Sequence, residues 1–307
     1  MPAYLVTGGA GFIGSHLVDS LLADGHKVRV LDDLSTGKRE NLGLRAELVV
    51  GDVGDPVGVA AAAKDCDGIF HLAAIASVQR GNEDWAGTHH TNLTAAIHVL
   101  DAARHARKGG AVPVVYASSA AIYGDNPDLP LAETARPQPL SAYGADKLGC
   151  ELHARVGGVV HGIPTAGFRF FNVYGPRQDP KSPYSGVISI FAERARAKTA
   201  CRIQGDGAQA RDFVYVADVV AALRLGLSAA SVSAPVFNVG TGIATRIVDL
   251  ARTLQRLAGS PADPEFTEAR AGDIRLSLSE PARLRALGWR PSVALEEGLR
   301  RTLDSLG

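Results

Sequence analysis

The sequence predicts an α/β fold, a doubly wound parallel sheet (Rossmann) with a smaller C-terminal α/β substrate lobe. Three observations support this prediction. Short apolar segments alternate with helical patterns through the first half of the chain. The first apolar segment ends in a glycine-rich turn, and the second ends in two aspartates. Because strands that are apolar on both faces need helices on both sides, such repeated units indicate a parallel sheet.

The expected strands of this sheet are five apolar runs, at residues 3–7, 27–31, 47–50, 68–72 and 112–117. Helical patterns lie between them, and the two longest later patterns run from Asn82 to Arg107 and from Ala142 to Val160. Folds of this kind bind their ligands beyond the carboxyl ends of the strands.

The rhythm changes after about residue 172, where three prolines fall in one loop at 174–185. Shorter elements are expected beyond it, with helices near 187–198, 246–258 and 294–305 and strands near 201–204, 213–216 and 236–239. We predict a nucleotide-binding domain at 1–171 and an interleaved substrate lobe at 172–307. Residues 212–240 are expected to rejoin the first domain.

Composition limits the range of functions. The chain has 307 residues, 46% of them hydrophobic, and Lys+Arg and Asp+Glu each total 32. No net charge therefore attracts nucleic acid or an anionic membrane. Cys66, Cys150 and Cys201 are widely spaced, which favours free thiols in a reducing compartment. Without a signal-peptide pattern, a membrane-spanning apolar stretch or metal-ligand spacing, we expect a cytoplasmic protein with no metal site.

The glycine-rich turn after the first strand predicts a pyrophosphate site. Gly8 allows a sharp turn, Gly11 allows phosphates to approach the backbone, and Gly14 lets the next helix pack closely on the strand. The first N–H groups of that helix then point at the anion. The alternative is a glycine-rich turn that binds nothing.

Asp32 and Asp33 end the second strand, about 20 residues after the glycines. A carboxylate at this position can bind a ribose 2′-hydroxyl and would repel a 2′-phosphate. The pattern therefore predicts NAD rather than NADP. The alternative is an aspartate that only caps the following turn.

Ser119, Tyr143 and Lys147 are the expected catalytic residues. Tyr143 and Lys147 are four residues apart and share one face of a helix, so the ammonium would lower the pKa of the phenol toward neutrality. A phenolate can then act as general base on a sugar hydroxyl that Ser119 also binds. Because a Tyr-x-x-x-Lys spacing also arises by chance, the prediction depends on its place after the dinucleotide pattern.

Seven motifs extend over essentially the whole chain. They are residues 7–17 (TGGAGFIGSHL), 51–53 (GDV), 71–74 (HLAA), 118–124 (SSAAIYG), 143–147 (YGADK), 168–176 (FRFFNVYGP) and 211–214 (RDFV). With these motifs the chain resembles the extended short-chain dehydrogenases/reductases, specifically the UDP-hexose 4-epimerases. The resemblance implies C4 epimerisation of a UDP-sugar through a 4-keto intermediate, with NAD kept bound.

The resemblance also implies the binding residues. Those expected at the cofactor are Gly8, Gly11, Phe12, Ile13, Gly14, Asp32, Asp33, Asp52, Val53, Leu72, Ala73, Ala74, Asn92, Tyr143 and Lys147. Those expected at the substrate are Ser77, Ser119, Phe171, Asn172, Arg211, Arg270, Asp273 and Ser277. Arginines suit a diphosphate because they bind phosphate with two donors. The alternative is that Arg211 and Arg270 each form an ion pair on the surface.

Two alanines separate this chain from related enzymes that eliminate water or carbon dioxide. Dehydratases and decarboxylases of similar sequence carry acidic residues where this chain has Ala120 and Ala121. Because alanine cannot transfer a proton, elimination is not expected. A nucleotide-sugar dehydrogenase or reductase and a non-catalytic NAD-binding sensor stay open as alternatives.

Substrate width is predicted from Ser277, seven residues after Arg270. In related 4-epimerases the residue at this position lies against the C2 substituent of the hexose and limits its size, so a small residue there admits an N-acetyl group. We therefore expect UDP-GlcNAc/UDP-GalNAc interconversion, with UDP-Glc/UDP-Gal as further substrates. One alternative is a Ser277 that faces outward and decides nothing. Another is a UDP-uronic acid 4-epimerase, which needs an extra cation to bind the sugar carboxylate. The candidates are Arg80, Arg177 and Arg275.

The resemblance further implies a homodimer, with the helices near 82–107 and 142–160 pairing with their copies. Ala95, Ala96, Ala102 and Ala103 leave room for close packing of helices. The alternative is that these alanines belong to the buried core.

Overall fold

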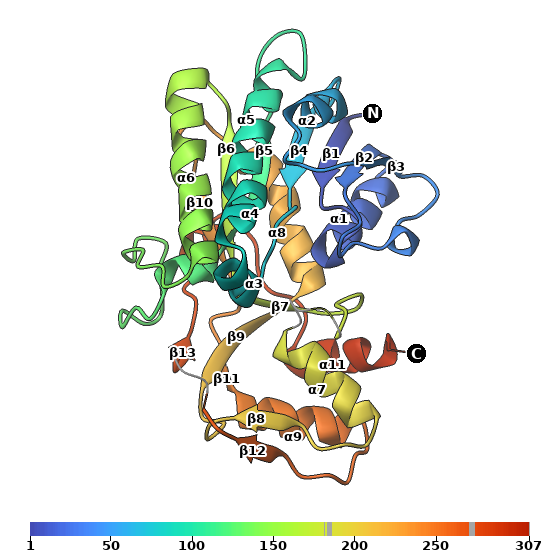
Figure 1. Ribbon diagram of the computed structural model, residues 1–307, viewed down its shortest axis with the longest axis vertical. Coiled ribbons are helices and arrows are strands. Elements are labelled where there is room, and N and C mark those ends of the chain that lie inside the picture. The colour runs from blue at the N-terminus through green and yellow to red at the C-terminus, as the bar shows by residue number, and fades with distance from the viewer. Residues whose placement is uncertain (181, 183–185, 270–273, 307) are drawn as a thin grey trace. The chain divides into compact units, whose positions relative to one another are not determined.

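The computed structural model describes residues 1–180, 182, 186–269 and 274–306 (Figure 1). The chain divides into two compact units. The first unit comprises Met1–Gly124, Pro137–Arg169 and Val220–Phe237, and the second comprises Asp125–Arg136, Phe170–Val219 and Asn238–Gly307.

A seven-stranded sheet forms the centre of the first unit. Its order is β10-β6-β5-β4-β1-β2-β3, and the five strands from β5 to β3 pair in parallel. The strands are β1 (Ala3–Thr7), β2 (Lys27–Asp32), β3 (Glu47–Val50), β4 (Gly68–His71), β5 (Val114–Ser119), β6 (Thr165–Phe170) and β10 (Val236–Val239). The expected doubly wound sheet is thus confirmed.

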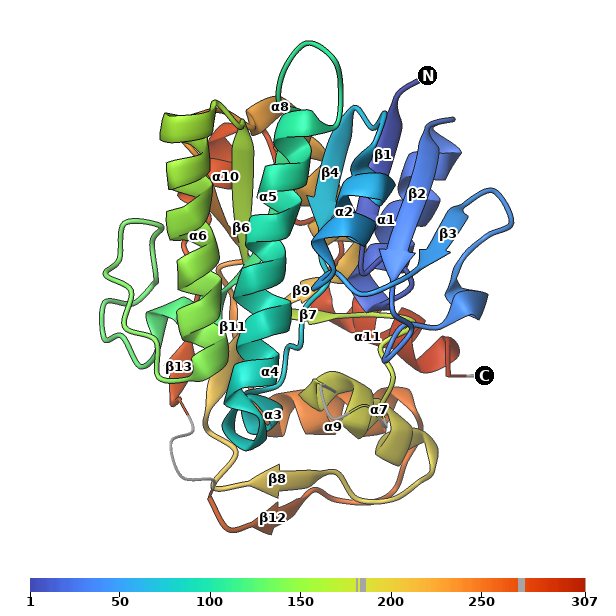
Figure 2. The same ribbon diagram turned by 45° about the horizontal axis from the view of Figure 1, so that its top comes forward.

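Helices cover both faces of this sheet (Figures 1 and 2). One face carries α2 (Pro56–Ala63), α5 (Ala95–His105) and α6 (Ala142–His161). The other carries α1 (Phe12–Ala23) and α8 (Val216–Ala229), which are joined by a hydrogen bond from Arg224 to Ser20. Leu5 and Ile69 from the sheet and Val59 and Val99 from the helices are completely buried between them.

The long helical pattern expected from Asn82 to Arg107 starts too early, because one helix ends and another begins at Asp84. Before the break lies α3 (Val78–Glu83). After it, α4 (Trp85–His89), a π turn (His90–Thr94) and α5 follow one another with helical backbone angles at each junction. The break comes at Asp84, whose extended φ of −135° ends α3 and whose side chain accepts a hydrogen bond from the Gly87 N–H. An aspartate in this position starts a new helix. The alanines at 95, 96, 102 and 103 are buried within the unit, so they belong to its core.

Helix α6 begins and ends with well-defined caps. Ser141 Oγ accepts a hydrogen bond from the Gly144 N–H at 3.1 Å. At the other end Gly162 adopts the left-handed conformation, with φ +66°, that glycine tolerates best. This helix confirms the pattern read from Ala142 to Val160.

The second unit contains two smaller sheets. Strand β9 (Ala210–Tyr215) pairs with β7 (Asn172–Tyr174), β11 (Ala244–Arg246) and β13 (Leu276–Ser277), while β8 (Arg202–Gln204) pairs with β12 (Glu265–Thr267). Its helices are α7 (Val187–Arg196), α9 (Ile247–Leu257), α10 (Ala282–Ala286) and α11 (Leu295–Asp304). No helix within the described ranges is both long and apolar enough to cross a membrane.

Buried carboxylates hold the late segments of the second unit in place. Asp212 accepts hydrogen bonds from the backbone and hydroxyls of Thr241 and Ser279. Asp218 likewise accepts from the backbone and hydroxyl of Ser292. Both carboxylates are compensated by hydrogen bonds, as burial requires.

A buried ion pair fastens α6 to the large sheet. Arg169 in β6 donates two hydrogen bonds to Glu151 in α6, at 2.9 and 2.7 Å, and a third to the Tyr123 hydroxyl at 2.7 Å. The Ser118 hydroxyl donates to the same Glu151 carboxylate at 2.5 Å. The side chains of the ion pair are only 5% and 8% exposed, so each charge depends on the other.

We expect Arg169→Met to lower the free energy of unfolding by about 3–5 kcal/mol, because it leaves the Glu151 carboxylate buried without its counter-charge. Urea unfolding followed by circular dichroism measures the change. Arg202→Met is the matched control, because Arg202 and Glu265 form a largely exposed ion pair whose loss should alter the unfolding curve little. Equal curves for the two variants would contradict this account of α6.

Candidate functional site: the nucleotide end of the sheet and the strand β9 cluster

The glycine turn between β1 and α1 combines tight packing with one open position. At Gly8, with φ +69°, a Cβ would lie 2.6 Å from the Ala73 nitrogen, and at Gly14 it would collide with the Gly8 carbonyl. At Gly11 a Cβ would meet only the Gly8 oxygen, at 3.3 Å. Since Gly11 also begins α1 without a side-chain cap, backbone N–H groups there remain available for an anion. The turn therefore fits a pyrophosphate.

The two aspartates at the end of β2 differ in their surroundings. Asp32 is buried, and its two oxygens each accept one backbone hydrogen bond, from Ala10 and from Leu34, both at 2.9 Å. Burial raises the pKa of the Asp32 carboxyl, against the lowering effect of these hydrogen bonds. Asp33 is exposed and accepts from the backbone and hydroxyl of Ser35. A carboxylate oxygen can accept more than one hydrogen bond, so Asp32 keeps capacity for a ribose hydroxyl beside the glycine turn.

The segment after β4 lies against the glycine turn. Leu72 N–H donates to the Thr7 carbonyl at 3.1 Å, and Ala73 N–H lies 3.4 Å from the Thr7 hydroxyl. Asn92, in the π turn, binds the backbone of Ile75 from both sides, accepting at 2.8 Å and donating at 3.1 Å. Its amide thus holds the backbone at Ile75. At the end of β3, Asp52 accepts from the Gly54 N–H, and Val53 is buried.

His71 is a buried polar residue to which the sequence analysis gave no role. Its Nδ1 shares a 2.8 Å hydrogen bond with the Thr7 hydroxyl. Burial, with a smaller contribution from the Lys147 charge, lowers the pKa of His71 to about 3, so the imidazole is neutral near pH 7. The only sequence signal was a histidine at the end of an apolar strand.

Tyr143 and Lys147 lie on one face of α6, as their spacing predicts. The Lys147 Nζ is 5.8 Å from the centre of the Tyr143 ring, and Lys147 is almost completely buried. No residue that the structure describes forms a hydrogen bond with this ammonium. Its donors are therefore available to a ligand.

Ser119 ends β5 and begins the short helical turn Ala120–Tyr123, where its hydroxyl accepts from the Ala121 N–H at 3.1 Å. A Cβ at Gly144 would lie only 2.6 Å from the Ala121 oxygen, so glycine lets the first turn of α6 pack against this segment. The structure thereby brings the Ser119 and Tyr143 segments together. Ser77 is buried and caps α3 by accepting from the Arg80 N–H.

In the second unit, three of the expected substrate residues surround the start of β9. Arg211 lies in β9, and Ser277 in β13 is its register partner. The Asn172 side chain donates to the Asp212 carbonyl at 3.3 Å, and Phe171 before it is buried. Arg270 and Asp273 lie outside the described residues. Arg275 forms two hydrogen bonds with the exposed Asp206, at 2.8 and 3.0 Å.

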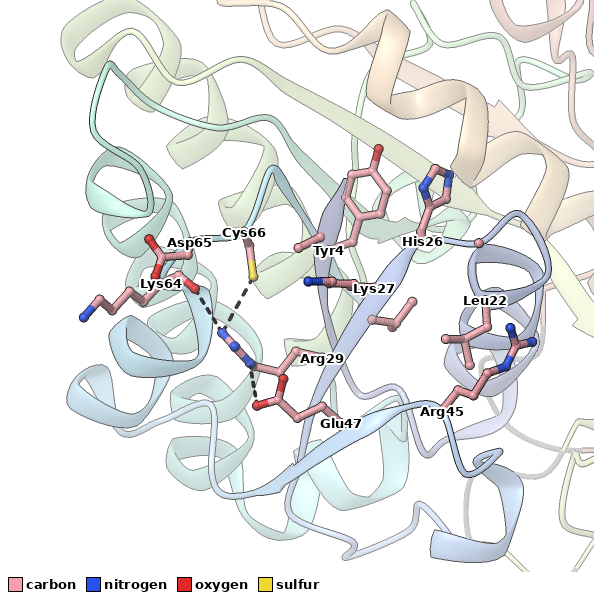
Figure 3. Close-up of a pocket in the computed structure, with 13 residues that line it drawn as sticks. Tyr4, Leu22, His26, Lys27, Arg29, Arg45, Glu47, Lys64, Asp65 and Cys66 are labelled. Carbon is pink, nitrogen blue, oxygen red and sulfur yellow. Dashed lines mark hydrogen bonds and ion pairs between the residues drawn. The ribbon is translucent and has the colours of Figure 1, made fainter. Parts of the chain in front are cut away.

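A pocket of about 360 Å³ lies at the other end of the large sheet (Figure 3). It is lined by the amino-terminal ends of the strands, including Tyr4, Lys27 and Glu47. Arg29 within it is already bound to Glu47 and to the carbonyls of Ala62 and Lys64. Its lining includes no residue of the glycine turn at 8–14, so the pocket is separate from that turn.

Comparisons with known proteins agree with this geometry. The model of the NAD dependent epimerase/dehydratase family matches residues 4–240. The chain is 41% identical over 310 residues to a UDP-glucose 4-epimerase of Mycolicibacterium smegmatis, covering 98% of this chain and 97% of that protein.

Two solved structures resemble the fold closely. A Thermotoga maritima UDP-glucose 4-epimerase with UDP-glucose has a TM-score of 0.94 and 37% identity, and a UDP-N-acetylglucosamine 4-epimerase of Methanobrevibacter ruminantium, in complex with UDP-N-acetylmuramic acid, has 0.93 and 35%. Each match covers 99% of this chain and 98% of the other. The chain therefore belongs to the NAD-dependent epimerase/dehydratase family.

Proposed function

We propose that this NAD-dependent UDP-sugar 4-epimerase interconverts UDP-GlcNAc and UDP-GalNAc and also accepts UDP-Glc and UDP-Gal. The observation that carries the proposal is Ser277, a small side chain that is the register partner of Arg211. Arg211 is the proposed ligand of the substrate diphosphate, so its neighbour in the sheet belongs to the same substrate-binding region. A small residue there leaves space for an N-acetyl group on C2 of the hexose.

The residues of the first unit fit NAD. The open space at Gly11 and the start of α1 would take the pyrophosphate, and Asp32 would take the adenosine ribose. Lys147, whose ammonium has no hydrogen bond within the described part of the chain, would take the nicotinamide ribose. When bound, NAD accepts the hydride from C4 of the sugar and returns it, so the reaction has no net redox change.

Tyr143 and Ser119 would handle the proton of the sugar C4 hydroxyl. Tyr143 would take the proton as general base and return it after the 4-keto sugar has turned its other face. Ser119 would hydrogen-bond the same hydroxyl, and Lys147 would stabilise negative charge on the phenol oxygen. For the diphosphate we propose Asn172, Arg211 and Arg270, so that the UDP is held while the sugar moves.

Two observations favour this reaction over its alternatives. Ala120 and Ala121, in the turn after Ser119, cannot supply the acid that an elimination requires. For a UDP-uronic acid, Arg275 was one of three candidate cations, and its guanidinium is engaged by Asp206 on the surface.

The chain also carries an unpartnered apolar stripe that fits a second copy. On α6, Leu152, Val156, Val159 and Val160 are at least half exposed. Their spacing places them on one side of the helix. We propose a homodimer in which α5 and α6 pair with their copies, since an exposed apolar stripe of this kind marks an interface. The outward side chains of α6, rather than the buried alanines of α5, would form the contact.

We further propose a cytoplasmic location. The three cysteines are all free and buried. Such thiols suit a reducing compartment.

We expect Tyr143→Phe to lower kcat by at least about 100-fold, the usual contribution of a general base. Proton NMR of the sugar C4 signals measures the epimerisation directly, and bound nucleotide and melting temperature should stay at wild-type values. Tyr4→Phe, at the far end of β1, is the control and should keep full activity. Substantial epimerase activity in Tyr143→Phe would refute the assigned base.

For Ser277→Tyr we expect kcat/KM for UDP-GlcNAc to fall at least about tenfold relative to that for UDP-Glc, because the ring would fill the space for the N-acetyl group. Ser277→Ala, which stays small, should leave the ratio unchanged. A panel with UDP-GlcNAc, UDP-Glc and UDP-glucuronic acid gives the ratios. If Ser277→Tyr keeps the wild-type ratio, the claim about substrate width is wrong.

We expect Val156→Lys to shift the protein from dimer to monomer in sedimentation velocity, because a charge would be buried in the apolar stripe. Val57→Lys, at an even more exposed apolar position on α2, should leave the sedimentation coefficient at the dimer value. A wild-type protein that sediments as a monomer would rule out the proposed dimer.

A further inference from the structure

A buried carboxylate lies between the two catalytic candidates of α6. Asp146 follows Tyr143 by three residues and directly precedes Lys147, and its side chain is only 5% exposed. Its Oδ1 is 2.8 Å from the Nδ1 of His89. Its Oδ2 is buried and has no hydrogen-bond partner among the described residues. Because a carboxylate removed from water needs compensation, Asp146 depends strongly on His89.

His89 connects α6 to α4 and the π turn, residues 85–94, which together form the α4–π segment. It is the last residue of α4 and directly precedes the π turn. Within that turn Asn92 holds the backbone of Ile75. One helical turn beyond Asp146, the Cys150 thiol donates to the Asn92 carbonyl at 3.2 Å. Two side chains of α6, four residues apart, therefore bind consecutive parts of the α4–π segment.

The first turn of α6 lies beside α3 and α4. A Cβ at Gly81 would be in ordinary van der Waals contact with the Ala142 Cβ, at 3.6 Å, and with the Thr88 Cγ2, at 3.7 Å. His89 itself is about half exposed, with 48% of its side chain accessible. Removing its ring therefore takes away a hydrogen bond without opening the core.

We propose that His89 and Asp146 are a positioning pair that fixes the Tyr143–Lys147 turn of α6 against the α4–π segment. This inference rests on the proposed function in one respect, the catalytic roles of Tyr143 and Lys147. The Nδ1–H of His89 donates to Asp146 Oδ1 and keeps the carboxylate inside the packed interface. Without this donor, Asp146 moves toward water and displaces the turn that carries both neighbours. A displacement of about 1 Å can cost about 100-fold in rate.

Two substitutions of His89 test whether the hydrogen bond to Asp146 sets the catalytic rate. One removes the donor and the other replaces it. In His89→Ala we expect kcat for C4 epimerisation to fall about 10- to 100-fold, with KM for the UDP-sugar within about threefold of wild type. In His89→Asn the side-chain amide takes the place of Nδ1–H, and kcat should recover to within about threefold. Asp146→Asn keeps an acceptor for His89 and should behave like His89→Asn. His105→Ala, an exposed histidine at the end of α5, should match wild type.

Hydrogen exchange of the NAD-loaded enzyme, followed by mass spectrometry, gives a readout that needs no turnover. We expect faster exchange at residues 85–94 and 142–150 in His89→Ala and near wild-type exchange in His89→Asn. A wild-type enzyme that epimerises no UDP-sugar would sink the proposed function, while this exchange pattern would still report on the pair. Unchanged exchange in His89→Ala, a kcat within twofold of wild type, or no recovery in His89→Asn would overturn the inference.

Discussion

The ion pair between Arg169 and Glu151 is the constraint on which the arrangement of the first unit depends. Both charges are buried, so each must stay within reach of the other, and this fixes α6 on β6. The same carboxylate accepts from Ser118, beside Ser119, and the same guanidinium donates to Tyr123. Because Glu151 lies one helical turn after Lys147, satisfying a buried charge also sets the position of the proposed catalytic residues.

The nucleotide end of this unit relies on backbone groups more than on charged side chains. The glycine turn presents the backbone N–H groups at the start of α1. Asp32 is itself held by backbone N–H groups. His71 is neutral because burial keeps its pKa low. Lys147, like Arg169, is a buried cation of this unit. In a protein without net charge, helix dipoles and N–H groups can supply positive potential locally, and this is where the proposed dinucleotide site lies.

Local patterns predicted most strands of the large sheet, α6 and the shared face of Tyr143 and Lys147, because periodicity and spacing of four residues act within one element. They did not predict β6. The start of the helix expected at Asn82 was wrong for a local reason of another kind: Asp84 caps a new helix, and apolar periodicity does not register such a cap. The alanines of α5 fit either an interface or a core by sequence. Packing against the sheet decided for the core.

By itself the sequence determined which chemical groups are present and at what spacing: glycines after the first strand, an acid at the end of the second, a phenol and an ammonium four residues apart, and alanines at 120 and 121. Only the tertiary structure decided which groups meet across long separations. Thr7 binds His71, His89 binds Asp146, and Ser277 lies beside Arg211. These partners are 57 to 66 residues apart, and strand register and helix packing, which no short sequence window contains, bring them together.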